Sequence, residues 1–105
     1  MDDHWGNFNS FGGIEMKTVK DFDIKLERMI ELLTQGGQID WARNFIRIQQ
    51  NLKFNLTDSK REILSMYGGM GSLNDVVLYA NGAALISENN EFFDLKSTLY
   101  NMCYD

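Results

Sequence analysis

Apolar residues recur at three- and four-residue steps along the first part of the chain. Between residues 18 and 35 this stripe consists of Val19, Phe22, Leu26, Met29, Ile30 and Leu33. The spacing places them along one face of an α-helix. Thr18 followed by Asp21 resembles a capping signal at the start of this helix. Gly36 and Gly37 predict its end, because glycine adopts the left-handed C-terminal conformation without a Cβ clash.

Two further helices are predicted from the same spacing. Asp40 is the expected N-cap of the second helix, whose apolar face is Trp41, Phe45, Ile48 and Leu52. The third is expected to start near Asp58 or Ser59, where Ser59 and Glu62 fit a capping box. It carries Ile63, Leu64 and Tyr67, and the glycines at 68 and 69 predict its end.

The period changes in the last third of the chain. Two short apolar runs, VVLY (76–79) and AALI (83–86), flank Asn81 and Gly82, a pair typical of a tight hairpin turn with positive φ. A final helix is expected from about Asn90, with Phe92, Leu95, Leu99, Met102 and Cys103 on one side. The prediction is a helix-dominated α+β fold with three N-terminal helices, one short β-hairpin and one C-terminal helix. Residues 1–13 lack a period and are expected to form a flexible arm, and residues 14–105 a single globular domain.

The run VVLY is apolar on both faces of its predicted strand, which a hairpin covered on one face does not require. One face is therefore expected on the helical core. The other would be covered by the N-terminal arm, a second subunit or a partner protein.

Composition narrows the class of protein. The chain has 105 residues, 44% of them hydrophobic, which fits one globular domain. No apolar run is long enough for a membrane span and no signal peptide opens the chain. A single cysteine cannot form an internal disulfide and suits a reducing compartment, so a cytoplasmic location is expected.

The net charge of −5 disfavours direct binding to nucleic acid and favours a basic protein partner. Three carboxylates step by four along the first helix, and three cluster at the start of the last. The candidate partner-binding residues are Asp23, Glu27, Glu31, Glu88, Glu91 and Asp94, together with Asp75 in the glycine loop. Two simpler interpretations stay open: a solvated helix face for the first set, and favourable interaction with the helix dipole for the second.

The stretch MYGGMGSLND (66–75) raises the question of a phosphate-binding loop. Such a loop follows a strand and leads through Gly-Lys-Ser/Thr into a helix. Here the order is inverted, no lysine is present, and Asp75 would repel an anion. A helix stop followed by a corner is the favoured interpretation.

Catalytic constellations are also disfavoured. His4, the only histidine, falls in the predicted arm, and Cys103 lies on the apolar face of the last helix as an expected buried thiol. One histidine and one cysteine do not make a zinc site. No enzyme activity, cofactor or metal is expected.

The stretch 64–79, followed by 88–103, resembles a family of small, largely uncharacterised bacterial proteins with a signature close to MYGGMGSxND. The coinciding residues are Tyr67, Gly68, Gly69, Gly71, Ser72, Asn74 and Asp75. Some proteins of this type resemble immunity proteins of bacterial toxin systems, including contact-dependent growth inhibition. The resemblance implies an antitoxin that covers the active site of a cognate toxin. The acidic charge of the chain favours a nuclease as this toxin, because nuclease active sites are basic. The alternatives are a structural or regulatory homo-oligomer, for example a homodimer, that pairs through its hairpin and, third, an enzyme.

Overall fold

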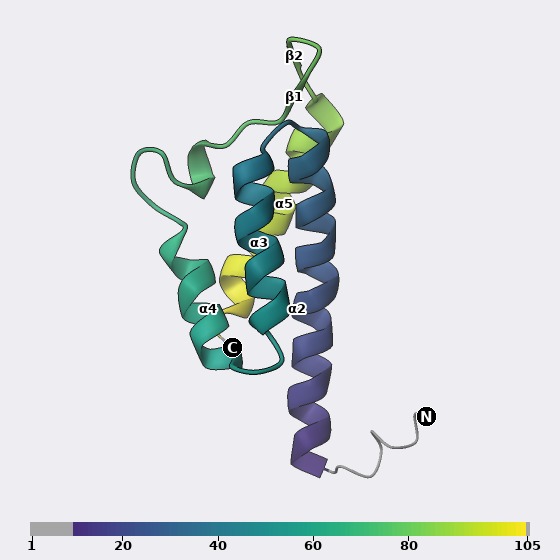
Figure 1. Cartoon of the computed structure of the whole chain (residues 1–105), viewed down its shortest axis with the longest axis vertical. Helices are drawn as coiled ribbons and strands as arrows, with labels where there is room; N and C mark the ends of the chain where they lie inside the picture. Colours follow the sequence, from purple (N-terminus) through teal and green to yellow (C-terminus); the bar gives the residue numbers. More distant parts are fainter. Residues whose placement is uncertain (1–9, 105) are drawn as a thin grey trace.

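The structure is a computed structural model that describes the backbone of residues 10–104 and the side chains of residues 17–104. This part of the chain contains four α-helices, one 3-10 turn and one two-stranded antiparallel hairpin, which confirms the predicted helix-dominated α+β class (Figure 1). The elements are α2 (Ser10–Gln35), α3 (Ile39–Asn51), α4 (Leu56–Ser65), η1 (Leu73–Asp75), β1 (Tyr79–Ala80), β2 (Ala83–Ala84) and α5 (Ile86–Met102).

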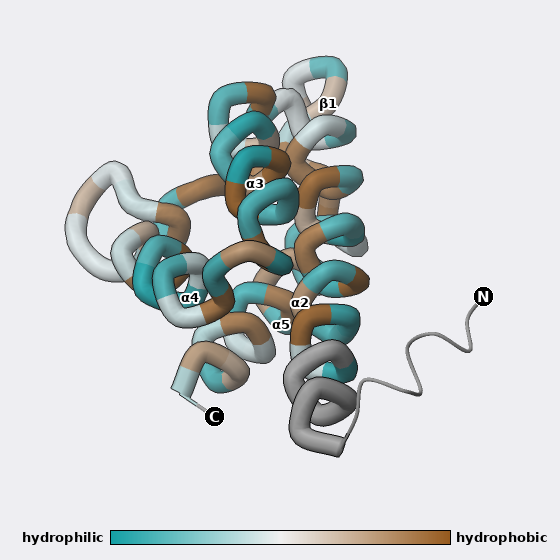
Figure 2. Tube along the Cα trace, turned by 60° about the horizontal axis from the view of Figure 1, so that its bottom comes forward, coloured by the Kyte–Doolittle hydropathy of each residue, from teal (hydrophilic) through white to brown (hydrophobic). Residues whose placement is uncertain are grey.

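The long helix α2 forms one side of the molecule, and α3 returns beside it in the opposite direction (Figure 1). Helix α4 contacts α3, and α5 packs against both α2 and α4. The hairpin lies at the end of the molecule where α2 turns into α3 (Figure 1). Hydrophobic and hydrophilic positions alternate around the helices, as their amphipathic spacing predicts (Figure 2).

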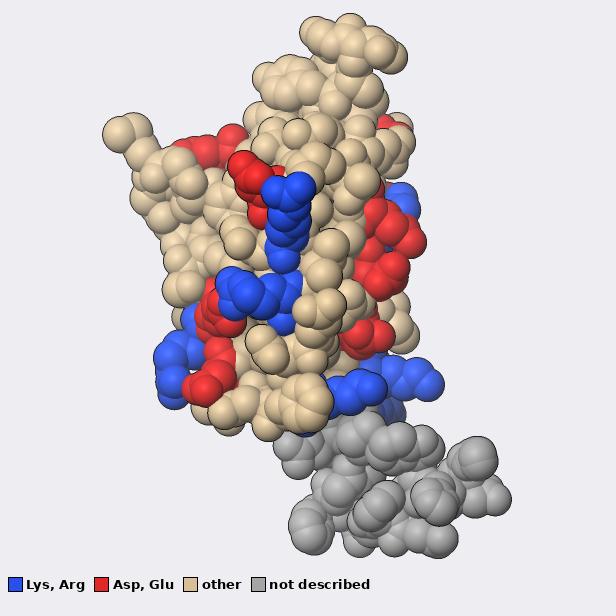
Figure 3. Space-filling model, viewed as in Figure 1, with Lys and Arg blue, Asp and Glu red and all other residues tan. Residues whose placement is uncertain are grey.

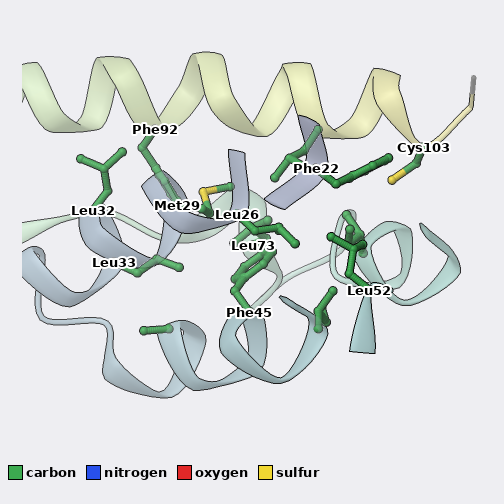
Figure 4. Packing of buried hydrophobic residues seen from close by; sticks show 14 of the residues in the cluster. Phe22, Leu26, Met29, Leu32, Leu33, Phe45, Leu52, Leu73, Phe92 and Cys103 are labelled. Carbon is green, nitrogen blue, oxygen red and sulfur yellow. The ribbon is translucent and has the colours of Figure 1, made fainter. Parts of the chain in front are cut away.

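One hydrophobic core joins all four helices and the 3-10 turn. Its largest fully buried side chains come from α2, α3, α4 and α5 and from the segment 73–78, and most of them point into a common interior (Figure 4). They are Phe22, Leu26, Met29, Leu32, Leu33, Phe45, Ile48, Leu52, Ile63, Leu73, Leu78 and Phe92. The apolar stripes predicted for the helices therefore supply the core.

The corner between α2 and α3 accepts the chain that leads into the hairpin. Gln38 N–H donates to the carbonyl of Leu33 (2.8 Å), a bond that closes α2 at its glycines as predicted. A Cβ on Gly36 would lie 2.6 Å from Cβ of Leu78, so glycine is required for this close approach. The carbonyl of Gly36 also accepts from Tyr79 N–H (3.1 Å). The absence of a side chain at position 36 thus lets the hairpin dock on the helical pair.

The side chain of Asn89 in the first turns of α5 holds the base of the hairpin. Its Oδ1 accepts from Leu78 N–H (2.9 Å), and its Nδ2 donates to the carbonyls of Leu78 (3.0 Å) and Leu85 (2.8 Å). Leu85 N–H donates to the same Leu78 carbonyl (2.9 Å). One side-chain amide thus satisfies backbone groups that a neighbouring strand would otherwise satisfy.

The predicted starts of the first two helices are wrong. Helix α2 begins at Ser10 rather than Thr18, so Thr18 lies inside the helix and does not cap it. Of the predicted arm, residues 10–13 are helical and residues 1–9 lie outside the described part. In α3, Gln38 occupies the N-cap position without a side-chain bond, and Asp40 lies within the first turn. A carboxylate at that position interacts with the helix dipole instead of capping one N–H group.

Helix α4 also starts earlier than the capping-box pattern indicated. Its N-cap is Asn55, whose Oδ1 accepts from the backbone N–H of Asp58 (3.0 Å). The expected cap, Ser59, is buried within the helix. Asparagine is as good an N-cap as serine, so the sequence offers two possible starts for this helix. The helix begins at the earlier one.

The hairpin is shorter than predicted, and the last helix is longer. The hairpin turn at Asn81 and Gly82 has positive φ at both residues (55° and 78°), as predicted. Only residues 79–80 and 83–84 pair, in the register Tyr79 with Ala84 and Ala80 with Ala83. Helix α5 starts at Ile86 rather than near Asn90, with Leu85 at the N-cap position, and the Asn89 side chain donates to the Leu85 carbonyl.

Replacing Asn89 by alanine should destabilise the fold by about 1–3 kcal/mol, since the backbone groups of Leu78 lose partners in a partly buried site. The matched control is Asn90→Ala, at an exposed neighbour in the same helix. Both changes raise helix propensity equally, so the difference isolates the hydrogen bonds. Thermal and urea unfolding measure it, and equal stability of the two variants would contradict the assigned role.

Candidate partner-binding surface

Arg28 joins the two predicted acidic sets into one surface. Its Nε and Nη2 donate to the two carboxylate oxygens of Glu91 on α5 (2.6 and 2.8 Å), and its Nη1 donates to Glu31 on α2 (2.9 Å). The ridge on α2 and the cluster on α5, which lie 63 positions apart at this contact, thus become neighbours. We call the six residues Asp23, Glu27, Glu31, Glu88, Glu91 and Asp94 the acidic surface. Figure 3 shows acidic side chains gathered along the edge of the molecule where α2 runs.

The other carboxylates of the acidic surface make weaker contacts. Glu27 accepts from Nε2 of Gln49 on α3 (2.9 Å), and Glu88 accepts from Nε2 of Gln35 (3.4 Å). Asp23 and Asp94 are exposed. The ion pairs found among the described residues involve none of these four carboxylates. They therefore keep their negative charge available to a partner.

Positive side chains bound the acidic surface on α2. Lys20 lies one turn before Asp23 on the same helix, and Lys17 lies one turn earlier still. Ile24 is exposed one turn before Arg28 and offers an apolar contact beside the carboxylates. The surface thus contains both charge and an apolar side chain.

Asp75, the seventh predicted residue, is used within its own loop. Its Oδ2 accepts from the backbone N–H of Gly71 (2.7 Å), and no described contact joins it to the six residues of the acidic surface. Its charge acts on Lys96 instead, where it opposes the effect of burial on the pKa of that amine.

The glycine loop has the geometry of a corner. Gly68 and Gly69 have φ values of 85° and 82°, as expected for residues that follow a helix and reverse the chain. Leu73 N–H then donates to the carbonyl of Met66 (2.8 Å), which closes the loop. It leads into the three-residue turn η1 and not into a helix, so it lacks the N-terminal helix dipole on which phosphate sites depend.

Lys96 is a functional candidate that the sequence analysis missed. It is 8% exposed and is the buried charged residue among those described. Its Nζ lies 3.5 Å from the carbonyl of Leu73 and 4.8 Å from the ring centroid of Phe92. Burial lowers the pKa of Lys96. The available signal was its spacing, because Lys96 lies between Phe92 and Leu99 on the apolar face of α5.

A cleft of about 510 Å³ opens next to Lys96, between the end of α4, the glycine loop and α5. It is lined by Leu64, Tyr67, Gly68, Asn74, Phe93, Lys96, Ser97, Tyr100, Asn101 and Tyr104. The ring centroids of Tyr67 and Tyr100 are 5.1 Å apart, and those of Tyr100 and Tyr104 are 5.2 Å apart, both edge to face. The hydroxyl of Tyr67 donates to the carbonyl of Lys96 (2.8 Å), and burial raises the pKa of Tyr67. We call this site the tyrosine cleft.

Cys103 is buried, as predicted, at the end of α5. Burial raises the pKa of its thiol to about 11, so it is a poor source of thiolate at neutral pH. In the described part of the chain, no group of three or more His, Cys, Asp or Glu residues could hold a metal ion. None of the helices described is both long and apolar enough to cross a membrane.

The pKa of Glu91 should depend on Arg28. The hydrogen bond from Arg28 lowers the pKa of Glu91 below its ordinary value of 4.5. The pair therefore stabilises the fold above about pH 4.5, and this contribution is lost as the pH falls through the lowered pKa. We expect Arg28→Met to raise the pKa of Glu91, and the difference in melting temperature from the wild type to vanish in acid.

Titration of the side-chain carboxyl carbon by NMR measures this pKa directly. Arg43→Met is the matched control, since Arg43 is an exposed arginine that lies 3.8 Å from Asp40 and contacts neither member of the Arg28 pair. An unchanged Glu91 titration in Arg28→Met would show that the bidentate contact does not persist in solution.

Comparison with known proteins adds a family. No significant match to the chain was found among curated proteins or among solved structures. Residues 34–86, just over half of the 105 residues, match the model of one protein family. The matched stretch runs from the last turn of α2 to the start of α5 and contains the whole glycine loop. The chain therefore belongs to the family described as "Domain of unknown function (DUF6966)".

Proposed function

We propose that the chain is an immunity protein that binds and neutralises a cognate bacterial toxin, a nuclease, by covering its active site. The observation that carries this proposal is the acidic surface. Six carboxylates lie on α2 and α5, and one arginine, Arg28, joins the two helices by pairing with two of them. A nuclease active site is basic because it binds the phosphates of its substrate, so the charges of the two proteins are complementary.

The acidic surface would act first on the rate of association. Opposite charges raise the rate at which two proteins meet in the correct orientation, and salt screens this effect. The affinity itself would come from apolar contacts buried at the centre of the interface. Ile24, exposed one turn before Arg28, offers such a contact. The resemblance around MYGGMGSLND to proteins similar to immunity proteins supports the same function.

The Arg28 contact gives the surface a defined shape. A bidentate pair fixes the relative position of α2 and α5 at the point where both carry carboxylates. Along α2, Asp23 and Glu27 precede Arg28, and along α5, Glu88 and Asp94 lie three positions before and after Glu91. A partner would meet a preformed arrangement of negative charge, which favours association with little rearrangement.

A second candidate function is a homo-oligomer that pairs around the hairpin. Leu78 is fully buried, whereas Val77 and Tyr79 on the outer side are exposed, so the described part of the chain does not cover the outer face. Ile39 and Ile86 are exposed at the same end of the molecule. Two short strands alone are marginal, and a second subunit could cover these side chains.

Light scattering across a range of concentrations separates the two candidates. The immunity function predicts a monomer that forms a complex of one chain with one toxin. A stable dimer of the isolated chain that Tyr79→Lys dissociates, while Ile24→Lys leaves it intact, would instead favour pairing at the hairpin end.

The direct test starts from the reading frame next to the gene of this chain. Its product, expressed alone, should stop growth, and co-expression of the chain should restore growth. With the purified pair, we expect Asp23→Lys and Asp94→Lys each to slow association several-fold at low salt and to weaken its salt dependence. Asp40→Lys is the matched control, because it makes the same charge change on an exposed aspartate of α3, outside the acidic surface.

Two results would contradict the proposal. A harmless neighbouring product that does not bind the chain would contradict the immunity function. Protection with equal association rates in all three variants would keep an antitoxin and remove the acidic surface as its binding site.

A further inference from the structure

The structure assigns a second binding site to the tyrosine cleft, and we propose that it takes a small aromatic carboxylate. The site consists of other residues than the acidic surface, and the proposal does not rest on the toxin that this surface would bind. Its components are the buried ammonium of Lys96, aromatic rings from the entry of the glycine loop, from α5 and from the residues after α5, and polar side chains at the rim.

Lys96 provides the reason for a negatively charged ligand. Its ammonium has three N–H donors, and the described structure supplies one acceptor, the Leu73 carbonyl at 3.5 Å. Among the side chains of residues 17–104, no carboxylate lies within ion-pair distance of Nζ, although the residue is more than nine-tenths buried. A buried cation without an ion pair is unfavourable. An anion in the cleft would supply the missing acceptors and the opposite charge.

The aromatic side chains provide the reason for a ring. Tyr67 and Tyr100 form an edge-to-face pair beside Lys96, and Tyr104 extends it to the rim. Phe93 and Tyr104 are both about two-thirds exposed, at 65% and 66%. Exposed rings around a cavity favour a planar apolar ligand that stacks against them. The volume of about 510 Å³ lies within the range of ligand sites, roughly 300–1,000 Å³.

The surrounding charge selects a single negative charge over several. The cleft holds one cation, and the negative charge of Asp75 already acts on it. The whole chain carries a net charge of −5. A polyphosphate would therefore meet one ammonium and be repelled by the rest of the protein. A monocarboxylate on an aromatic ring satisfies Lys96 without this repulsion, and the amides of Asn74 and Asn101 at the rim can bond its other polar groups.

Benzoate and its neutral analogue benzamide are suitable probes, because they share the ring and differ in charge. In NMR titrations of the full chain, benzoate should cause saturable shifts at Tyr67, Lys96 and Tyr100. Its affinity should exceed that of benzamide by at least about tenfold, the contribution of a charge-assisted hydrogen bond. Acetate, which lacks the ring, should bind more weakly than benzoate.

Lys96→Met should abolish the preference for benzoate, since methionine keeps the apolar stem and removes the charge. Lys53→Met is the matched control at an exposed lysine outside the cleft and should bind as the wild type does. Equal affinity for benzoate and benzamide, or no saturable binding of benzoate, would overturn the proposal. Either result would leave Lys96 with a structural role only, as a donor to the Leu73 carbonyl.

A second pair of variants keeps the test decisive if Lys96→Met fails to fold. Phe93→Ala and Tyr104→Ala remove exposed rings and should leave the core intact. Both should weaken benzoate binding several-fold and leave acetate binding unchanged. Unchanged benzoate affinity in the combined Phe93→Ala/Tyr104→Ala variant would also overturn the proposal. These results do not bear on toxin neutralisation, because neither Phe93 nor Tyr104 belongs to the acidic surface.

Discussion

Leu78 has a fully buried side chain, but only a short stretch of chain beyond it pairs as a strand. Its backbone N–H and carbonyl must still find partners, because unpaired polar groups in a buried site are strongly unfavourable. The amide of Asn89 provides both. Since Asn89 belongs to α5, this contact joins the return of the chain after the glycine loop to the start of the last helix. The position of α5 therefore depends on it.

Both functional candidates depend on the position of α5 in turn. Near its start, Glu91 meets Arg28 of α2 and completes the acidic surface. Further along α5, the Lys96 ammonium contacts the Leu73 carbonyl, and Lys96 lines the tyrosine cleft. Gly36 contributes from the other side, because its lack of a Cβ allows Leu78 to approach the corner of α2 and α3. A few close contacts at one end of the molecule thus position charges and rings along its length.

The sequence predicted the helices well because each buries a stripe with a regular spacing, which requires no knowledge of the partner element. It predicted their starts poorly, because several residues near each start can act as an N-cap. For α4, both Asn55 and Ser59 have capping side chains, and the packed structure uses Asn55. For α3, Asp40 has a capping side chain but lies inside the first turn. The hairpin was overestimated because the Leu78 N–H bonds to the side chain of Asn89 and not to a facing strand. The pairing of Arg28 with Glu91 spans 63 positions and has no local signal. Lys96 occupies an apolar position, but its charge concealed its burial.

The two charged residues at the centre of the proposed sites lie on different sides of one helix. Glu91 and Lys96 are five positions apart, which corresponds to about 140° around an α-helix. Asp94, in contrast, lies three positions before Ser97 of the cleft lining, so the acidic surface and the tyrosine cleft border each other there. An effect of one ligand on the other through the protein would require a shift or a rotation of α5. The bidentate Arg28 contact at one end and the Tyr67 hydroxyl on the Lys96 carbonyl further along both oppose such a movement. These two contacts therefore disfavour coupling of the sites through movement of α5.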